Sequence, residues 1–432
     1  MKNRKTFIML IAFLFIFILP SFSISLMNMS LTDPFESEEQ LKVFPQVNNL
    51  SAEDEEYLDN SSISILTKAS GDEIYSWFGH SSLLLETPEN SLVYDYGVFS
   101  FESDNFYKNF IQGKMYYVLM VSYLNQNLGV SENQERTVQK LTLDLTDTQK
   151  ASIINFLHYN SQNKNRTYLY NFYKDNCATR IRDILNWVAD DDFKQWAQNT
   201  ASVGTFRELS NKSLSRSPII FWCLNAIQGE AADRVGTRWD DMYLPSEMEK
   251  SIIEYNKFGS STSYLYENTL DPGYIESKDI NNHVLMYSIA AFILSLIGLY
   301  FKHRKQLRNS RIYGIYNTII MIFLTVISLA VFYLSFFSSI DAAWYNENLV
   351  FLNPISSIVL LISAIRTLKK KKEPMKRLAQ FERVSRWYSH SIFVLFVLKL
   401  IFNNTLIQNN LNIMIPVYIY FIIQGLFFRT KK

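Results

Sequence analysis

The chain has few of the residues on which many protein classes depend. Its 432 residues include two cysteines, five histidines, 13 glycines and ten prolines. Two cysteines allow one disulfide at most, which excludes a disulfide-rich scaffold. No segment is dominated by proline or glycine and no repeat recurs at a fixed period, which argues against fibrous and solenoid architectures. Glycine-rich phosphate loops and the HExxH and GxSxG motifs are also missing from the sequence.

The net charge of +1 hides an uneven distribution along the chain. Residues 28–282 carry 37 acidic and 21 basic side chains, a balance of −16, whereas the last third holds long and almost uncharged apolar stretches. An acidic surface repels nucleic acid, so we expect no nucleic-acid partner. The distribution predicts a membrane protein with one sizeable water-exposed domain.

The N-terminus has the three parts of a secretory signal. Basic residues within Met1–Lys5 precede the apolar run Phe7–Leu19, and small residues follow Pro20. Residues 1–27 are therefore predicted to be a cleaved signal peptide or an uncleaved signal anchor. In either case the basic end stays in the cytoplasm and residues 28–282 are exported.

Residues 283–432 are predicted to form a transmembrane domain of five helices, because they contain five apolar segments near the length that crosses a bilayer. The segments are Val284–Phe301, Tyr313–Phe337, Leu349–Ile365, Tyr388–Phe402 and Leu411–Phe428. Lys/Arg residues number five in 302–311, nine in 366–386 and three in 429–432, and there are none in 341–348 or 403–410. This alternation follows the positive-inside rule for five spans that begin outside and end in the cytoplasm.

Within the exported part we expect an acidic spacer over residues 28–60 and a folded domain over residues 61–282. Strands are predicted at Ile63–Thr67, Phe78–Glu86 and Ser91–Phe99, the last two joined by a turn that contains proline and asparagine. Helices are predicted at Asp147–Tyr159, where Thr146 and Gln149 have the spacing of a capping box, and at Asp175–Val188. Strands followed by helices indicate an α+β domain.

Cys177 stands at the start of the second predicted helix, with Asp175 or Asn176 as its N-cap. Isoleucine, leucine and valine recur on the helix face that carries the thiol, so we expect this face to pack against the sheet. The positive end of the helix dipole favours the thiolate, which is the nucleophilic form of cysteine. The alternatives are a buried structural cysteine or one half of a disulfide with Cys223.

His80 lies at the beginning of a predicted strand. If the turn is centred on Pro88 and Glu89, facing residues of the hairpin have numbers that sum to 177, and Asp95 becomes a diagonal neighbour of His80. A carboxylate there would orient the imidazole and complete a Cys–His–Asp arrangement. The hydroxyl of Tyr94 or Tyr96 is the rival for this third position, and a purely structural histidine is the alternative.

The remaining candidates have simpler interpretations. Cys223 is surrounded by apolar residues, where a thiol is inert, and His158 is expected on the surface at the end of a helix. Arg180 and Arg182 are either anion ligands or part of a solvated helix face paired with Asp183. The few Cys and His residues have no spacing typical of a zinc site, so we expect no metal and no cofactor.

Three motifs carry a family resemblance. Tyr75-Ser-Trp-Phe-Gly-His80, Tyr94-Asp-Tyr-Gly-Val-Phe-Ser100 and Asp175-Asn-Cys-Ala-Thr-Arg-Ile-Arg-Asp183 resemble the periplasmic domain of the bacterial Lnb-type lipoprotein N-acyltransferases. Members of that family join this domain to five transmembrane helices. The order of His before Asn-Cys also resembles the permuted papain-like acyltransferases of the lecithin:retinol type.

The resemblance implies a permuted papain-like domain on the periplasmic side of the bacterial inner membrane. Cys177 would be the nucleophile and His80 the base, while Asp95 departs from the His that is common in the third position of the lecithin:retinol type. The substrates would be a phospholipid acyl donor and the N-terminal amine of a diacylated lipoprotein. We further expect substrate contacts from Tyr75, Gly79, Asn176 and Arg180.

Two other functions remain compatible with these residues. A membrane-tethered papain-like peptidase or amidase acting on cell-wall peptide would use the same Cys–His pair. A non-catalytic binding module would tolerate replacement of both Cys177 and His80.

Overall fold

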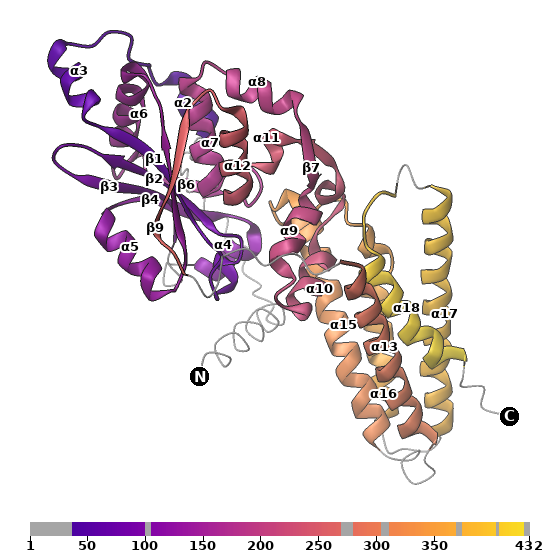
Figure 1. The fold of residues 1–432 in the computed structure, drawn as a ribbon. Helices are drawn as coiled ribbons and strands as arrows, with labels where there is room; N and C mark the ends of the chain where they lie inside the picture. Colours follow the sequence, from indigo (N-terminus) through magenta and orange to yellow (C-terminus); the bar gives the residue numbers. More distant parts are fainter. Residues whose placement is uncertain are drawn as a thin grey trace. The chain divides into compact units, whose positions relative to one another are not determined.

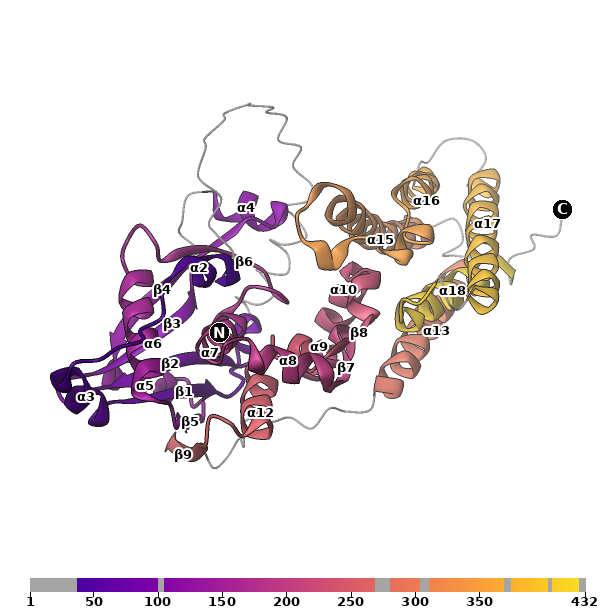
Figure 2. The same ribbon diagram turned by 90° about the horizontal axis from the view of Figure 1, so that it is seen from above.

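The computed structural model describes residues 37–99, 105–268, 280–303, 311–368, 374–402 and 406–426. The predicted signal segment, residues 1–27, lies outside the described residues. The rest of the chain divides into two compact units. The sheet unit contains residues 28–214 and 234–277, and the helical unit contains residues 215–233 and 278–432. Figures 1 and 2 show the elements of each unit from two directions.

The sheet unit is built on a seven-stranded sheet in the order β6-β4-β3-β2-β1-β5-β9. Its strands are β1 (Ser62–Lys68), β2 (His80–Glu86), β3 (Ser91–Val98), β4 (Met115–Tyr123), β5 (Val138–Leu143), β6 (Thr167–Tyr170) and β9 (Ser260–Tyr266). Every neighbouring pair is antiparallel. A separate two-stranded sheet joins β7 (Ala201–Thr205) to β8 (Val235–Thr237).

Helices cover both faces of the large sheet (Figure 1). The main core lies between one face and helices α2, α6, α7 and α12, where alternate strand residues such as Ile63 and Ile65 meet Ile153 and Ile181. The smaller core on the opposite face contains Leu84 and is packed against α5. This alternation follows from the period of two along a strand, which sends successive side chains to opposite faces.

The helices of the sheet unit vary from one turn to four. They are α2 (Ser37–Val43), α3 (Ala52–Asp59), α4 (Phe106–Gln112), α5 (Leu124–Asn133), α6 (Asp147–Asn160), α7 (Cys177–Val188), α8 (Asp192–Asn199), α9 (Phe206–Leu214), α11 (Arg238–Asp241) and α12 (Pro245–Tyr255), with a 3₁₀ turn η1 (Ile74–Ser76). The mixed α/β class predicted from the sequence is therefore correct.

Local predictions hold where a turn or a cap determines the structure. In the β2–β3 hairpin, Leu83 faces Tyr94 and Glu86 faces Ser91, so the facing numbers sum to 177 as predicted. Helix α6 begins with the predicted capping box, in which the Thr146 hydroxyl and the Gln149 side chain each accept from the other's backbone amide. Each rule depends on short-range backbone geometry, which explains its success.

The prediction that residues 28–60 form only a spacer needs correction for the part that the structure describes. Leu41 of α2 and Leu58 of α3 are each 3% exposed and belong to the main core. The acidic residues Glu53–Glu56 dominate the composition of this segment, but they occupy only the outer side of α3. Together with Phe44 and Leu50, the two leucines pack the segment against the domain.

The helical unit contains a helix at each of the five predicted apolar segments. They are α13 (Ile280–His303), α15 (Arg311–Phe337), α16 (Pro354–Thr367), α17 (Pro374–Ile401) and α18 (Leu411–Leu426). Windows in α13, α15 and α17 are long and apolar enough to cross a membrane, while α16 and α18 are shorter apolar helices. Helix α16 begins only at Pro354, because Asn353 caps it and residues 347–350 form the 3₁₀ turn η4.

Residues 215–233, which we placed inside the exported domain, pack with the helical unit instead. They contain the apolar helix α10 (Pro218–Ile227) and the 3₁₀ turn η2 (Glu230–Asp233). The Asn346 side chain donates to the carbonyls of Ala226 and Ile227 at 2.9 and 2.8 Å. The Gln408 amide donates to the Gln228 carbonyl at 2.9 Å. Two helix-connecting loops therefore bind the C-terminal end of α10.

Lys399, an unusual residue for a predicted span, belongs to the same end of the bundle. Its ammonium pairs with Glu347, and both side chains are largely buried. The other Glu347 oxygen accepts from the Gln408 backbone amide at 2.8 Å. Lys399 thus belongs to a polar cluster inside the bundle, where charged residues of a span usually lie.

Candidate active site

Cys177 is the first residue of α7, and its position is determined by the cap of that helix. The Asn176 side-chain oxygen accepts from the amides of Ala178 and Thr179 at 2.9 and 3.0 Å. The Thr179 hydroxyl completes the capping box by accepting from the Asn176 amide at 2.7 Å. The thiol therefore sits on the first turn, where the helix dipole favours a negative charge.

Asn176 does more than cap the helix. Its side-chain NH₂ donates to the carbonyls of Phe172 and Tyr243 at 2.7 and 2.9 Å. Both donors and the acceptor oxygen are thus engaged within the protein, and the residue is 4% exposed. This position makes Asn176 a structural anchor of the α7 N-terminus, rather than the substrate ligand that the sequence suggested.

Replacing Asn176 with alanine is expected to destabilise the protein by about 2–4 kcal/mol, because the cap is lost and two buried carbonyls lose their donor. The measurement is the thermal unfolding midpoint of the purified full chain. Thr146→Ala is the matched control, since it removes only the cap of α6, at the protein surface, and should cost about 1 kcal/mol. Equal effects of the two substitutions would contradict the anchoring role of Asn176.

His80 begins β2 and lies between Asp95 and Cys177. Its Nε2 is hydrogen-bonded to a carboxylate oxygen of Asp95. Cys177 lies beside the same ring, close enough for the charge of His80 to lower the pKa of its thiol. The structure thus brings together the three residues expected from the hairpin register and the helix cap. The rival tyrosines are elsewhere, since Tyr94 is buried in the main core and the Tyr96 hydroxyl donates to Asn160 at 2.7 Å.

The second oxygen of Asp95 faces two further polar groups. Lys68 Nζ lies 3.5 Å from Asp95 Oδ2, and the Asn127 amide donates to the same oxygen at 3.4 Å. Asp95 is 9% exposed, and burial alone would raise its pKa. The charge and hydrogen bond of His80, helped by Lys68 and Asn127, hold the pKa of Asp95 well below its usual range. The carboxylate is therefore ionised and fixed in orientation.

His80 and Cys177 each stabilise the charged form of the other. Burial lowers the pKa of His80, but Asp95 and the Cys177 thiolate together raise it to about 9. Burial raises the pKa of Cys177, but the charge and hydrogen bond of His80 and the Ser81 backbone amide together lower it. Both shifts favour a thiolate–imidazolium pair at neutral pH. Such a pair is an activated nucleophile able to attack an acyl carbon.

Gly97 makes room for this pair. The register of β3 against β4 shifts between Asp95 and Val98, and Gly97 lies in this bulge with φ of +100°. A Cβ at residue 97 would stand 3.4 Å from His80 Cε1 and 3.7 Å from Cys177 Cβ. Glycine is favoured here both by the backbone conformation and by the close approach of the two side chains.

Arg180 and Arg182 are both buried, so neither lies on a solvated helix face, although Arg182 forms the predicted pair with Asp183. Arg180 is 3% exposed, forms a bidentate pair with Asp175 at 2.6 and 2.8 Å, and stacks over Tyr168. Arg182 pairs with Asp183 and lies over the Trp239 ring. The predicted solvated face is wrong, and the Arg180 guanidinium is held within the fold rather than presented to a substrate.

The other two predicted substrate contacts lie in the segment before His80. Tyr75, in η1, is 54% exposed, and its ring meets Phe99 edge to face. Gly79 has φ of +78°, and a Cβ there would approach the Lys68 carbonyl to 3.0 Å. Gly79 thus permits the tight turn into β2, while Tyr75 is available at the surface.

Sequence reasoning missed Lys68 and Asn127. Lys68 faces His80 across the β1–β2 pair, but 11 residues separate these strands, so no turn rule gives their register. Asn127 lies in α5, a helix absent from the predicted elements. The available signal was weak: a single lysine at the end of an otherwise apolar and hydroxyl-bearing strand.

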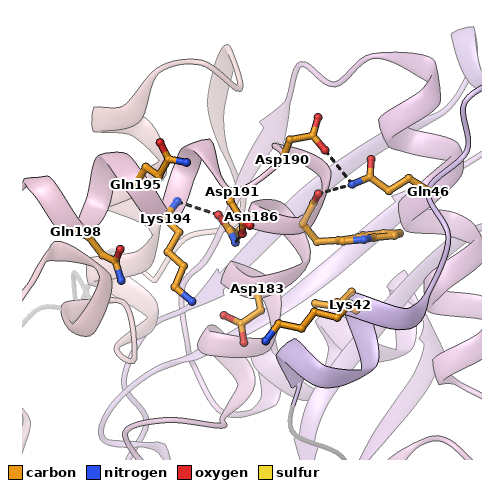
Figure 3. Close-up of a pocket in the computed structure, with 11 residues that line it drawn as sticks. Lys42, Gln46, Asp183, Asn186, Asp190, Asp191, Lys194, Gln195 and Gln198 are labelled. Carbon is orange, nitrogen blue, oxygen red and sulfur yellow. Dashed lines mark hydrogen bonds between the residues drawn. The ribbon is translucent and has the colours of Figure 1, made fainter.

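A separate hollow lies at the other end of α7 (Figure 3). It has a volume of about 520 Å³ and is lined by polar side chains that include Lys42, Gln46, Asn186, Asp190 and Lys194. Gln46 closes part of it by donating to the Trp187 carbonyl at 2.6 Å. Its lining contains none of the predicted site residues, so the candidate active site is at the Cys177 end of the helix.

Comparison with known families identifies the sheet unit. The family model of the Lnb N-terminal periplasmic domain matches residues 52–212, a range that includes His80, Asp95 and Cys177. No curated protein and no solved structure matches the chain. The matched region extends from α3 into α9 and contains the whole Cys–His–Asp arrangement. Residues 52–212 are therefore an Lnb-type N-terminal periplasmic domain, and the match supports an Lnb-type protein.

Proposed function

We propose that this protein is a membrane-bound lipoprotein N-acyltransferase. It moves a fatty acyl chain from a phospholipid to the N-terminal amine of a diacylated lipoprotein, through a thioester on Cys177. The observation that carries the proposal is the Cys177–His80–Asp95 arrangement inside the Lnb-type domain, in which Asp95 is hydrogen-bonded to His80 and His80 lowers the pKa of Cys177. The helical unit supports it, because both substrates are confined to a membrane.

In the first half-reaction the Cys177 thiolate attacks the ester carbonyl carbon of the phospholipid. The bond from this carbon to the glycerol oxygen breaks, and the departing oxygen takes the proton of the His80 imidazolium. A lysophospholipid leaves, and the acyl chain stays on sulfur as a thioester. Asp95 holds the imidazole in position and stabilises its charged form.

In the second half-reaction the neutral N-terminal amine of the lipoprotein attacks the thioester carbonyl. His80 takes a proton from the nitrogen, the carbon–sulfur bond breaks, and the thiolate and imidazolium are restored. The product is an amide, so the acceptor becomes triacylated. No group outside the two substrates and the chain is consumed.

The start of α7 supplies a donor for the oxyanion formed in each half-reaction. The Asn176 cap occupies the amides of Ala178 and Thr179. The Cys177 amide has no acceptor among the described residues. Its N–H, at the positive end of the helix dipole, is therefore the donor that we assign to the oxyanion.

The loops that bind α10 support a topology in which these loops lie on the periplasmic side of the membrane. Residues 215–233 lie in sequence between two parts of the periplasmic unit. The loops that bind them, around Asn346 and Gln408, are the two that contain no Lys or Arg. Five spans with a cytoplasmic C-terminus satisfy both this contact and the positive-inside rule.

The test is mass spectrometry of the N-terminal lipopeptide of one abundant lipoprotein, from cells that lack the gene and from the same cells carrying wild type. We expect an amide-linked acyl chain only with wild type. An unchanged lipopeptide, together with altered peptides in a cell-wall digest, would replace the proposal with the peptidase or amidase function. An unchanged lipopeptide and an unchanged digest would favour a binding module.

A further inference from the structure

The helical unit contains an apolar cavity that the proposed chemistry does not use. It has a volume of about 340 Å³, is open on one side, and is lined by α10, α13, α15 and α18. The lining is almost wholly hydrocarbon and aromatic, with Trp222 and Cys223 on one wall and Pro416 and Phe421 on another. The volume is at the lower end of the roughly 300–1,000 Å³ of ligand sites, so it suits one chain rather than a complete lipid.

The two tyrosine hydroxyls of this lining are already bonded within the protein. The Tyr287 hydroxyl donates to the Pro218 carbonyl at 2.5 Å, and the Tyr420 hydroxyl donates to Asn317 at 3.2 Å. A water or a head group would find almost no hydrogen-bond partner there. Hydrocarbon is therefore the chemistry that the cavity fits.

The position of the cavity along the bundle indicates which leaflet supplies the chain. On α18 it is lined by residues from Pro416 to Phe421, five to ten residues after the helix begins at Leu411. At 1.5 Å per residue these lie about 8–15 Å from that end of the helix. Half of a hydrocarbon core of roughly 30 Å is about 15 Å, so the cavity has the depth of one leaflet. Gln408, just before α18, binds the segment that comes from the periplasmic unit.

We propose that this cavity binds one acyl chain of a glycerophospholipid from the outer leaflet. It is a lipid site built by α10, the segment that leaves the periplasmic unit, together with three helices of the bundle. As a donor site it rests on the proposed function. The binding itself does not, since it follows from the lining and the depth alone.

The test uses the full chain in vesicles of phosphatidylethanolamine that contain a trace of the same lipid with a diazirine at the end of one acyl chain. After irradiation, mass spectrometry maps the label. We expect it to concentrate on the cavity segments Ile219–Cys223 and Pro416–Phe421 rather than on apolar helix faces outside the cavity. The inactive variant Cys177→Ala should label equally, because binding precedes transfer.

A pair of neighbouring substitutions on α13 makes the test specific. Ala290 lines the cavity, and Ala290→Phe is expected to reduce the label in both segments by roughly tenfold, because the added ring occupies the space of the chain. Ile289 is 50% exposed and is not part of the lining, so Ile289→Phe should leave the label unchanged. Label spread evenly over exposed helix faces, or equal loss in both variants, overturns the proposal. Concentrated label in a protein that transfers no acyl chain would leave this inference standing and remove the proposed function.

Discussion

The Cys177→Ala variant is expected to lose acyl transfer by at least about 10⁴-fold while the protein remains folded and abundant. Removal of the nucleophile from a Cys–His or Ser–His unit removes nearly all of its rate enhancement. The substitution should cost little stability, because the thiol is partly buried and Asn176 rather than Cys177 holds the helix cap. The measurement is the rate at which the purified full chain, in phospholipid vesicles, transfers a labelled acyl chain to a synthetic diacylated lipopeptide.

Two single histidine variants provide the comparison and the control for this experiment. His80→Ala should produce a loss close to that of Cys177→Ala, because the two side chains act as one unit. His158, at the exposed C-terminal end of α6, is the matched control, and His158→Ala should transfer at the wild-type rate. Retained transfer by Cys177→Ala would remove the thioester from the mechanism. Equal losses in both histidine variants would point to damage of the fold instead.

The parts of the fold that the sequence predicted are those that local rules govern. The turn at Pro88 and Glu89 determines the hairpin register, the Thr146 cap determines the start of α6, and continuous apolar runs mark the five helices of the helical unit. Each rule acts over fewer than about 20 residues. Local rules did not predict the position of residues 215–233. Their contact with the helical unit depends on Asn346 and Gln408, which are more than 100 residues away in the sequence.

The residues of the candidate site also differ in whether local rules or long-range contacts determine their positions. Cys177, His80 and Asp95 were predicted because one helix cap and one hairpin register suffice to place them. Lys68 was missed because it reaches Asp95 through a β1–β2 pairing that no short turn specifies. Arg180 was misread because its spacing suggests an exposed helix position, whereas the Tyr168 ring and Asp175 bury it. A charged residue that is buried together with its partner is therefore easily mistaken for a surface residue when only the sequence pattern is considered.

Replacing Asp95 with asparagine is expected to slow acyl transfer by about 10²–10⁴-fold. The carboxylate fixes the orientation of His80 and, with Cys177, raises its pKa to about 9. The reactive form needs a deprotonated Cys177 and a protonated His80. In the wild type this form is therefore lost below the lowered pKa of Cys177 and above about pH 9. Without the Asp95 charge the pKa of His80 falls, so the alkaline limb should move down by roughly one unit or more.

The pH dependence separates this electrostatic role from a merely structural one. The rate of carboxymethylation of Cys177 by iodoacetate, followed on its own peptide by mass spectrometry, reports the thiolate–imidazolium pair without any acyl substrate, because the imidazolium attracts the anionic reagent. Asp95→Asn should narrow the pH range over which the thiolate–imidazolium pair reacts, and Asp95→Glu should restore part of it, because the charge returns at a less suitable distance. Asp59→Asn, which removes an exposed carboxylate of α3, should leave the profile unchanged. An Asp95→Asn profile with the wild-type alkaline limb would mean that Asp95 only supports the fold of β3 and does not set the charge of His80.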